Sequence, residues 1–92
     1  MIQLLEQQRQ QIDQIDRELV RLFEARMHVV QEVAQIKSKH HLPILDAQRE
    51  KQVITKVQGY LANPEFEDAL ADFYTELMRI SRQHQQQWND QN

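Results

Sequence analysis

The sequence predicts an all-α fold of three helices, of which the first is very long. The first 40 residues contain neither Gly nor Pro. Apolar residues recur in this stretch every seven positions, which is typical of a helix that packs along another helix. The whole chain of 92 residues holds one Gly, two Pro and no Cys, and its abundant Leu, Gln, Glu, Arg and Ala favour helix.

The first predicted helix runs from Ile2 to about His40. Its apolar residues form two series with a spacing of seven. One series is Leu5, Ile12, Leu19 and Val33, and the other is Ile15, Leu22, Val29 and Ile36. Together they occupy the a and d positions of one stripe. Pro43 is expected to end the helix, because proline cannot continue the backbone hydrogen bonds and disfavours helical geometry at Leu42.

The second helix is expected to start near Asp46, a good N-cap, and Gly59 lies near its end. Its inner side is predicted to carry Val53, Ile54, Val57, Tyr60 and Leu61. Asn63 and Pro64 have the pattern of an N-cap and a first-turn proline, and so open the third helix. The third apolar stripe is Phe66, Leu70, Phe73, Tyr74, Leu77, Met78 and Trp88. The polar tail is expected to fray from about residue 89.

The length of the first helix predicts an intertwined helical homodimer. Residues 1–92 form one domain, and a chain of this size buries too little surface for a robust core of its own. A helix of about 37 residues is about 55 Å long, whereas a compact domain of this size has a radius of gyration of about 12 Å. The helix must project beyond its partners, and a second copy is the simplest cover for its apolar stripe.

Composition excludes several classes of function. The net charge is −3 with both signs interspersed, which argues against a nucleic-acid partner. No signal peptide and no run of about 20 apolar residues is present, so we expect a cytoplasmic protein without a membrane partner. The four His residues do not have metal-ligand spacing, and neither a glycine-rich phosphate loop nor an activated nucleophile is evident. We therefore expect no metal and no cofactor.

Polar residues interrupt the apolar stripe of the first helix. Arg26 occupies the slot between Leu19 and Val33, and Lys37 follows three turns later on nearly the same face. Two inward cations suggest an anion site, since a buried guanidinium needs a counter-charge. The alternative is that Arg26 pairs with an internal acid and that Lys37 is solvated. Arg9 lies about 25 Å before Arg26, so it is either a surface arginine or part of an antiparallel partner's site.

The other two helices carry similar interruptions. Glu50 heads the inner stripe of the second helix, and Arg49 is a cation in a first turn, where it opposes the helix dipole. An ordinary charged helix start is the alternative. Ser81 and Gln85 lie in line with the third apolar stripe. For Gln85 the alternative is a solvated, glutamine-rich helix end.

Together these residues resemble a known family over residues 4 to 88. The most specific stretch is Lys37 through Glu50, above all the segment LPILDAQRE at residues 42–50. It resembles the loop and the second-helix start of the AroQ-type, all-helical chorismate mutases. Arg9, Ile12, Asp13, Ile15, Asp16, Ala25 and Arg26 are in the family's register. The resemblance implies a cofactor-free isomerase that converts chorismate to prephenate for phenylalanine and tyrosine biosynthesis.

The resemblance also implies roles for the polar residues around the substrate's carboxylates and ether oxygen. Arg26 would hold one carboxylate, and Arg9 of the other subunit would hold the second. Lys37 would reach a carboxylate and the ether oxygen. Gln85 would donate to the same ether oxygen from the opposite side. Lys37 and Gln85 would thus be the catalytic pair.

The remaining implied roles concern the ring hydroxyl. Glu50 and the backbone at Asp46 would hold it, while Arg49 and Ser81 complete the wall. Two related activities on the same scaffold stay open, 4-amino-4-deoxychorismate mutase and isochorismate-pyruvate lyase. The resemblance favours the mutase over the lyase at Ser81, because the lyases tend to carry a bulkier residue at the corresponding position. A non-catalytic helical dimerisation module is the alternative from another class.

Overall fold

The computed structural model describes residues 2–92, and within this range it contains helices and no strand. The three α-helices are α1 (Glu6–Lys39), α2 (Ala47–Gln58) and α3 (Glu67–Gln91). Two short 3₁₀ helices, η1 (Ile2–Leu5) and η2 (Pro64–Phe66), lead into α1 and α3. The predicted all-α fold with a very long first helix is confirmed.

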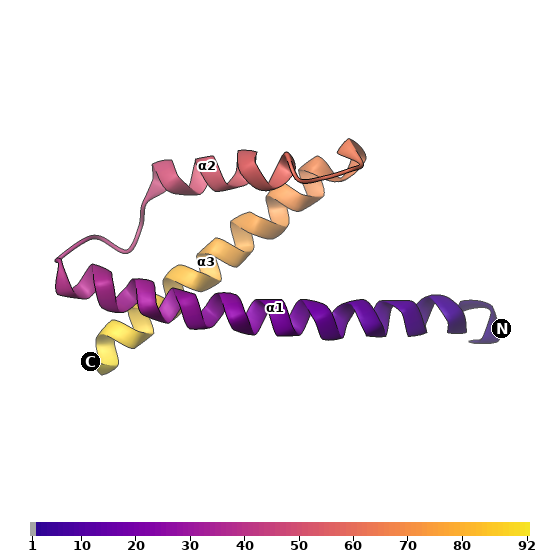
Figure 1. Cartoon of the computed structure of the whole chain (residues 1–92), viewed down its shortest axis with the longest axis horizontal. Helices are drawn as coiled ribbons and strands as arrows, with labels where there is room; N and C mark the ends of the chain where they lie inside the picture. Colours follow the sequence, from indigo (N-terminus) through magenta and orange to yellow (C-terminus); the bar gives the residue numbers. More distant parts are fainter. Residues whose placement is uncertain (1) are drawn as a thin grey trace.

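The three helices form an open frame in which α3 packs against both α1 and α2. In Figure 1, α1 runs along the whole length of the molecule, α3 crosses it obliquely, and α2 lies on the far side of α3 from the N-terminal half of α1. The molecule measures 55 × 29 × 16 Å, and its radius of gyration is 16.7 Å. A compact domain of this length would have a radius of about 12 Å, so the single chain is markedly extended.

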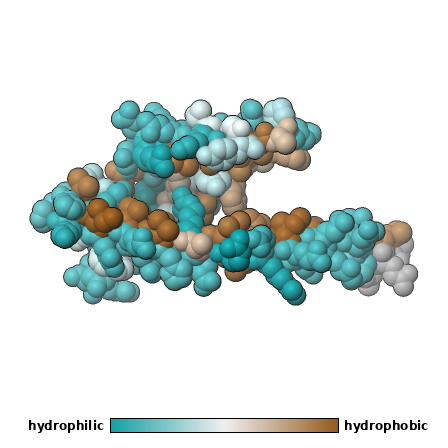
Figure 2. Space-filling model, in the orientation of Figure 1, coloured by the Kyte–Doolittle hydropathy of each residue, from teal (hydrophilic) through white to brown (hydrophobic). Residues whose placement is uncertain are grey.

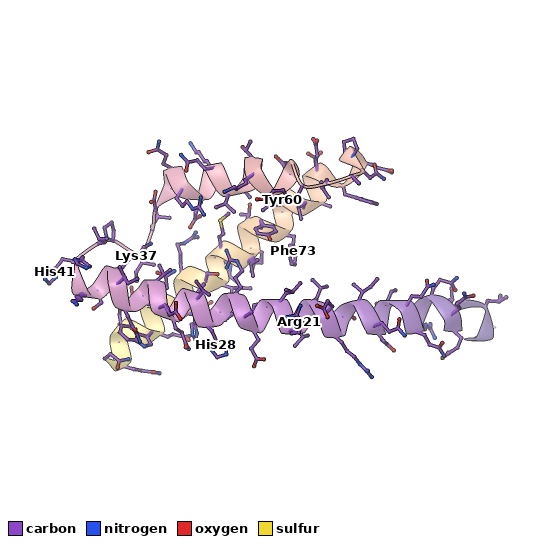
Figure 3. All side chains as sticks on the ribbon, viewed as in Figure 1. Arg21, His28, Lys37, His41, Tyr60 and Phe73 are labelled. Carbon is purple, nitrogen blue, oxygen red and sulfur yellow. The ribbon has the colours of Figure 1, made fainter. Side chains whose placement is uncertain are left out.

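The second helix begins at its predicted cap, whereas the cap predicted for the third helix opens η2, and α3 itself starts three residues later at Glu67 without a side-chain cap. The Asp46 carboxylate accepts a hydrogen bond of 3.0 Å from the Arg49 backbone N–H, which is an N-cap. Asn63 caps η2 in the same way through Glu65. The predicted end of α2 near Gly59 is confirmed, because the helix stops at Gln58 and Gly59 is its C-cap, but Tyr60 and Leu61 lie beyond the helix and not on its inner side. Tyr60 is 73% exposed (Figure 3).

The end of α1 is set by a left-handed turn rather than by Pro43. His41 has a φ of 55°. The Leu42 N–H donates to the Lys37 carbonyl at 2.8 Å, and the His41 N–H donates to the Ser38 carbonyl at 3.3 Å. This pair of bonds is a Schellman motif, which satisfies the last carbonyls of a helix. The chain leaves α1 before it reaches Pro43, and it then turns back toward α2.

The tail of α3 also differs from the prediction. Fraying is expected from about residue 89, but the helix continues to Gln91. Gln86 donates to the Asp90 carboxylate at 2.9 Å, and Asn92 donates to the Trp88 carbonyl at 2.8 Å. Side-chain hydrogen bonds of this kind support the last turn, where backbone carbonyls lack partners within the helix.

Among the residues whose burial the structure describes, the buried apolar core lies where α1 and α3 cross. It consists of Val30 and Ala34 of α1 and of Leu77 and Met78 of α3. Most of the predicted apolar stripe is exposed, from Leu5 in η1 through Leu22 in α1 and again at Val29 and Ile36. Figure 2 shows hydrophobic side chains in a row along α1 between hydrophilic ones. The prediction that the first helix projects beyond its partners with an uncovered apolar stripe is confirmed for the single chain.

Candidate active site

A cavity of about 190 Å³ lies between the C-terminal half of α1, the start of α2 and the C-terminal half of α3. Seven of the eight predicted site residues line it: Arg26, Lys37, Asp46, Arg49, Glu50, Ser81 and Gln85. Its apolar wall is formed by Val30, Val33, Ile44, Val53 and Met78. We call this the α1–α3 cavity. Three stretches that are far apart in the sequence thus bring their polar interruptions to one place.

Arg26 is anchored to α3 by a hydroxyl group and not by an acid. Its Nη1 donates to the Ser81 Oγ at 2.6 Å. Ser81 is 5% exposed, and its own hydroxyl donates to the Leu77 carbonyl at 2.8 Å. None of the ion pairs formed within residues 2–92 includes Arg26. The alternative in which an internal acid neutralises Arg26 is therefore wrong, and the guanidinium keeps its charge available at the cavity.

Lys37 is half-buried at the cavity and is not a freely solvated lysine. Its Nζ donates to the Ile44 carbonyl at 2.7 Å. Figure 3 shows Lys37 near the C-terminal end of α1, beside the segment that leads to α2. The Schellman turn at His41 brings that segment back within reach of the ammonium. Since an ammonium group has three donors, two remain for a ligand.

Gln85 belongs to the cavity wall and is 6% exposed, unlike the neighbouring Gln83, Gln86 and Gln87. The interpretation of Gln85 as part of a solvated helix end is therefore wrong. Its Oε1 is buried and has no hydrogen-bond partner among the described residues. Buried amide groups are usually hydrogen-bonded, and the amide oxygen and NH2 exchange places when the side chain flips, so this cavity-lining amide is a candidate ligand-binding group as an acceptor or, through Nε2, as a donor.

Glu50 lines the cavity from α2 and is paired with Arg82 of α3. The Arg82 Nη1 donates to both carboxylate oxygens. The side chains are 31% exposed for Arg82 and 26% exposed for Glu50. Arg82 is not among the predicted site residues. It lies four residues after Met78, and Ser81 lies three residues after Met78, so both side chains are on the helix face of Met78.

The charges around the cavity are unequal. Four cations, Arg26, Lys37, Arg49 and Arg82, face two carboxylates, Asp46 and Glu50. The lining therefore carries a formal excess of two positive charges beside an apolar wall. Such a lining suits a small dianion with an apolar body. Within residues 2–92, no group of three His, Cys, Asp or Glu side chains is placed to hold a metal ion.

Arg9 does not reach the α1–α3 cavity of its own chain. It is exposed in the N-terminal half of α1. Seventeen residues separate it from Arg26, which is about 25 Å along the helix axis.

Among the described residues, no helix combines the length and the apolar character that a transmembrane segment needs.

Comparison with known proteins gives one family. The model of the family described as chorismate mutase type II matches residues 8–86. The "T-protein" of Haemophilus influenzae is 33% identical over 78 residues, which cover 85% of this chain and 20% of that protein. The "Bifunctional chorismate mutase/prephenate dehydratase" of Aquifex aeolicus is 38% identical over 53 residues, or 58% of this chain and 15% of that protein.

A third relative is closer to this chain in size. The "Chorismate mutase" of Methanocaldococcus jannaschii is 34% identical over 58 residues, which cover 63% of this chain and 59% of that protein. The chain thus spans a fifth or less of the first two relatives and over half of the third. No solved structure matches the chain significantly.

Proposed function

The chain belongs to the chorismate mutase type II family, and we propose that it converts chorismate to prephenate in phenylalanine and tyrosine biosynthesis. One observation carries the proposal. Two unneutralised cations, Arg26 and Lys37, and the buried amide of Gln85 line a single small cavity. We also propose that the enzyme acts in the cytoplasm, where amino-acid biosynthesis takes place.

The proposed reaction requires cationic and hydrogen-bonding groups of the kind that line this cavity. It is a unimolecular Claisen rearrangement, in which an ether C–O bond breaks while a C–C bond forms. No acid, base or nucleophile is needed. The enzyme must hold the dianionic substrate in a compact, chair-like conformer. It must also stabilise the negative charge that grows on the ether oxygen, through donors that are already in place.

Lys37 and Gln85 are the proposed transition-state pair. The Lys37 ammonium is oriented by its bond to the Ile44 carbonyl, so its remaining donors are fixed before substrate binds. The Gln85 amide would donate to the ether oxygen from the α3 side. Arg26, held by Ser81, would bind one carboxylate, since guanidinium and carboxylate form two parallel hydrogen bonds.

The other end of the substrate carries the ring hydroxyl. Glu50 would accept its proton in a hydrogen bond, together with a contact from the backbone at Asp46. Asp46 itself serves as the N-cap of α2 through its side chain, which fixes this stretch of backbone. Arg49 would close the wall on the solvent side.

We further propose that a second copy of the chain completes the site. The exposed apolar stripe of α1 supports an antiparallel pairing of two α1 helices. In that arrangement Arg9 of one protomer would reach the cavity of the other and bind the second carboxylate. The excess of two positive charges around the cavity would then become three against a dianion.

Turnover by the purified protein tests the proposal. Chorismate should disappear as prephenate forms, followed by chromatography, with isochorismate and 4-amino-4-deoxychorismate run alongside. Lys37→Ala and Gln85→Ala should each lower kcat about 10²- to 10³-fold. Lys39→Ala and Gln86→Ala are matched controls, because both residues are exposed near their catalytic counterparts, and both should keep normal turnover.

Each alternative has its own result. Release of pyruvate from isochorismate at a higher kcat/KM than chorismate rearrangement would indicate the lyase. Preference for the amino substrate would indicate the aminodeoxychorismate mutase. A protein that converts none of the three, and keeps its fold and dimer when Arg26, Lys37 and Gln85 are replaced, would be a dimerisation module.

A further inference from the structure

The Arg82–Glu50 ion pair differs from the other contacts of the cavity cations. Arg26 is held by a hydroxyl and Lys37 by a backbone carbonyl, so both keep their charge for a ligand. Arg82 instead directs one nitrogen at both oxygens of Glu50 and joins α3 to α2. The charge of Arg82 therefore neutralises the Glu50 carboxylate, which the proposed function assigns to the ring hydroxyl.

We propose that Arg82 is a positioning residue that makes the Glu50 end of the cavity select a neutral hydroxyl over a cationic amine. The inference rests on the proposed function and extends it to the choice between chorismate and its 4-amino analogue. A lone Glu50 would attract an ammonium group at least as well as a hydroxyl, since a carboxylate is only an acceptor. The pairing with Arg82 removes this attraction.

The geometry leaves Glu50 able to bind the hydroxyl. Each carboxylate oxygen has two lone pairs, and Arg82 uses one direction at each. A hydroxyl donor can still approach from the cavity. An ammonium at the same place would lie within a few ångströms of the Arg82 guanidinium. The side chains of Arg82 and Glu50 are 31% and 26% exposed, so the site is partly shielded from water. Repulsion between like charges is strong at that distance away from bulk water.

The position of Arg82 on α3 also favours this role. Ser81 precedes it and Gln85 follows it by three residues, so one helix face supplies the anchor of Arg26, the partner of Glu50 and the amide at the ether oxygen. Arg79 offers a comparison three residues earlier. It also pairs with a glutamate, Glu76, but that pair is on the surface and outside the cavity.

The test measures a ratio of specificities. Chorismate and 4-amino-4-deoxychorismate are compared by kcat/KM at a pH where the amine is protonated. In Arg82→Gln the preference for chorismate should fall about tenfold or more, through a higher KM for chorismate and a lower KM for the amine. Arg82→Lys keeps the positive charge and should retain most of the preference. Arg79→Gln should leave the ratio unchanged.

The outcomes separate this inference from the proposed function. If the wild type rearranges chorismate but Arg82→Gln leaves the ratio unchanged, the inference is overturned and the function stands. An equal loss for both substrates, with a lower Tm, means that Arg82 only holds α2 to α3, and this also overturns the inference. If the wild type rearranges neither substrate, the proposed function fails and the inference fails with it.

Discussion

Arg9 and Arg26 offer a sharp experiment, because one α1 helix cannot bring both to the same ligand. They are about 25 Å apart along the axis, and the cavity at Arg26 holds only a small molecule. In the proposed dimer each site takes Arg26 from one protomer and Arg9 from the other. The single variants Arg9→Ala and Arg26→Ala should each lose most of their activity, since a buried carboxylate of the substrate would lack its partner.

Mixing the two inactive variants should restore activity by an amount that the geometry fixes. After full exchange of subunits, about half of the dimers contain one chain of each kind. In such a dimer one site has both arginines and the other site has neither. About one-quarter of all sites are then intact, and the mixture should reach about one-quarter of the wild-type rate at saturating chorismate.

Exchange is made measurable by giving one variant an affinity tag and following the recovery of untagged chains with it. Arg21→Ala serves as the control, because Arg21 is an exposed arginine of the same helix that pairs with Glu18; it should be active without mixing. If the mixture stays inactive although mixed dimers are recovered, Arg9 does not complete the partner's site. The proposed antiparallel arrangement of α1 would then be wrong.

Four further expectations follow from the same structure. Leu19 is exposed in the single chain, so Leu19→Asp should weaken the dimer, and light scattering should show monomers together with a lower thermal midpoint; an unchanged dimer would contradict the proposed interface. His41→Gly should raise the free energy of unfolding by about 0.5–1 kcal/mol, measured by urea denaturation, because glycine adopts the left-handed C′ position without strain; a lower midpoint would contradict this reasoning. Because Gln85 is neutral, kcat should vary little from mildly acidic to mildly basic pH, and a steep loss above neutrality would refute its role. On the acid side, the hydrogen bond from Arg79 holds the pKa of Glu76 below its ordinary value. This exposed pair therefore makes a small contribution to stability at pH values above the ordinary pKa of Glu76. The contribution is lost as the pH falls through the lowered pKa.

Helix positions could be predicted well where a local side chain decides them. Asp46 and Asn63 are caps because their side-chain oxygens accept from nearby backbone N–H groups. The predicted end of α1 at about His40 agrees with the observed end at Lys39, but the turn that makes this end could not be predicted in the same way. His41 occupies a left-handed position that is usually marked by glycine, so the sequence offers no signal there, and Pro43 is a later and weaker boundary.

The seven-residue apolar pattern of α1 marks one face of the helix, and the single chain buries another face. Val30 and Ala34, which pack on α3, belong to neither seven-residue series. Most members of both series are exposed. A period of seven follows contact along the whole length of a long helix, whereas α3 crosses α1 obliquely and needs only a few close residues.

The candidate site was predictable wherever a polar residue interrupts an apolar stripe, as at Arg26, Ser81 and Gln85. The contacts of these residues were not. The Ser81 hydroxyl at Arg26 and the carboxylate at Arg82 come from residues that are 55 and 32 positions away in the sequence. A pattern on one helix shows which face a side chain occupies, but the partner depends on how the helices cross.

The small core at the crossing of α1 and α3 makes the proposed activity depend on protein concentration. The four apolar side chains that are buried among the described residues contribute little against the conformational entropy of a chain of this length. In the proposed dimer most of the folding free energy comes from association, so mass action links folding, assembly and completion of the site. Dilution would then lower the specific activity and the thermal midpoint together, and a substrate analogue would restore the thermal midpoint by binding only to paired chains.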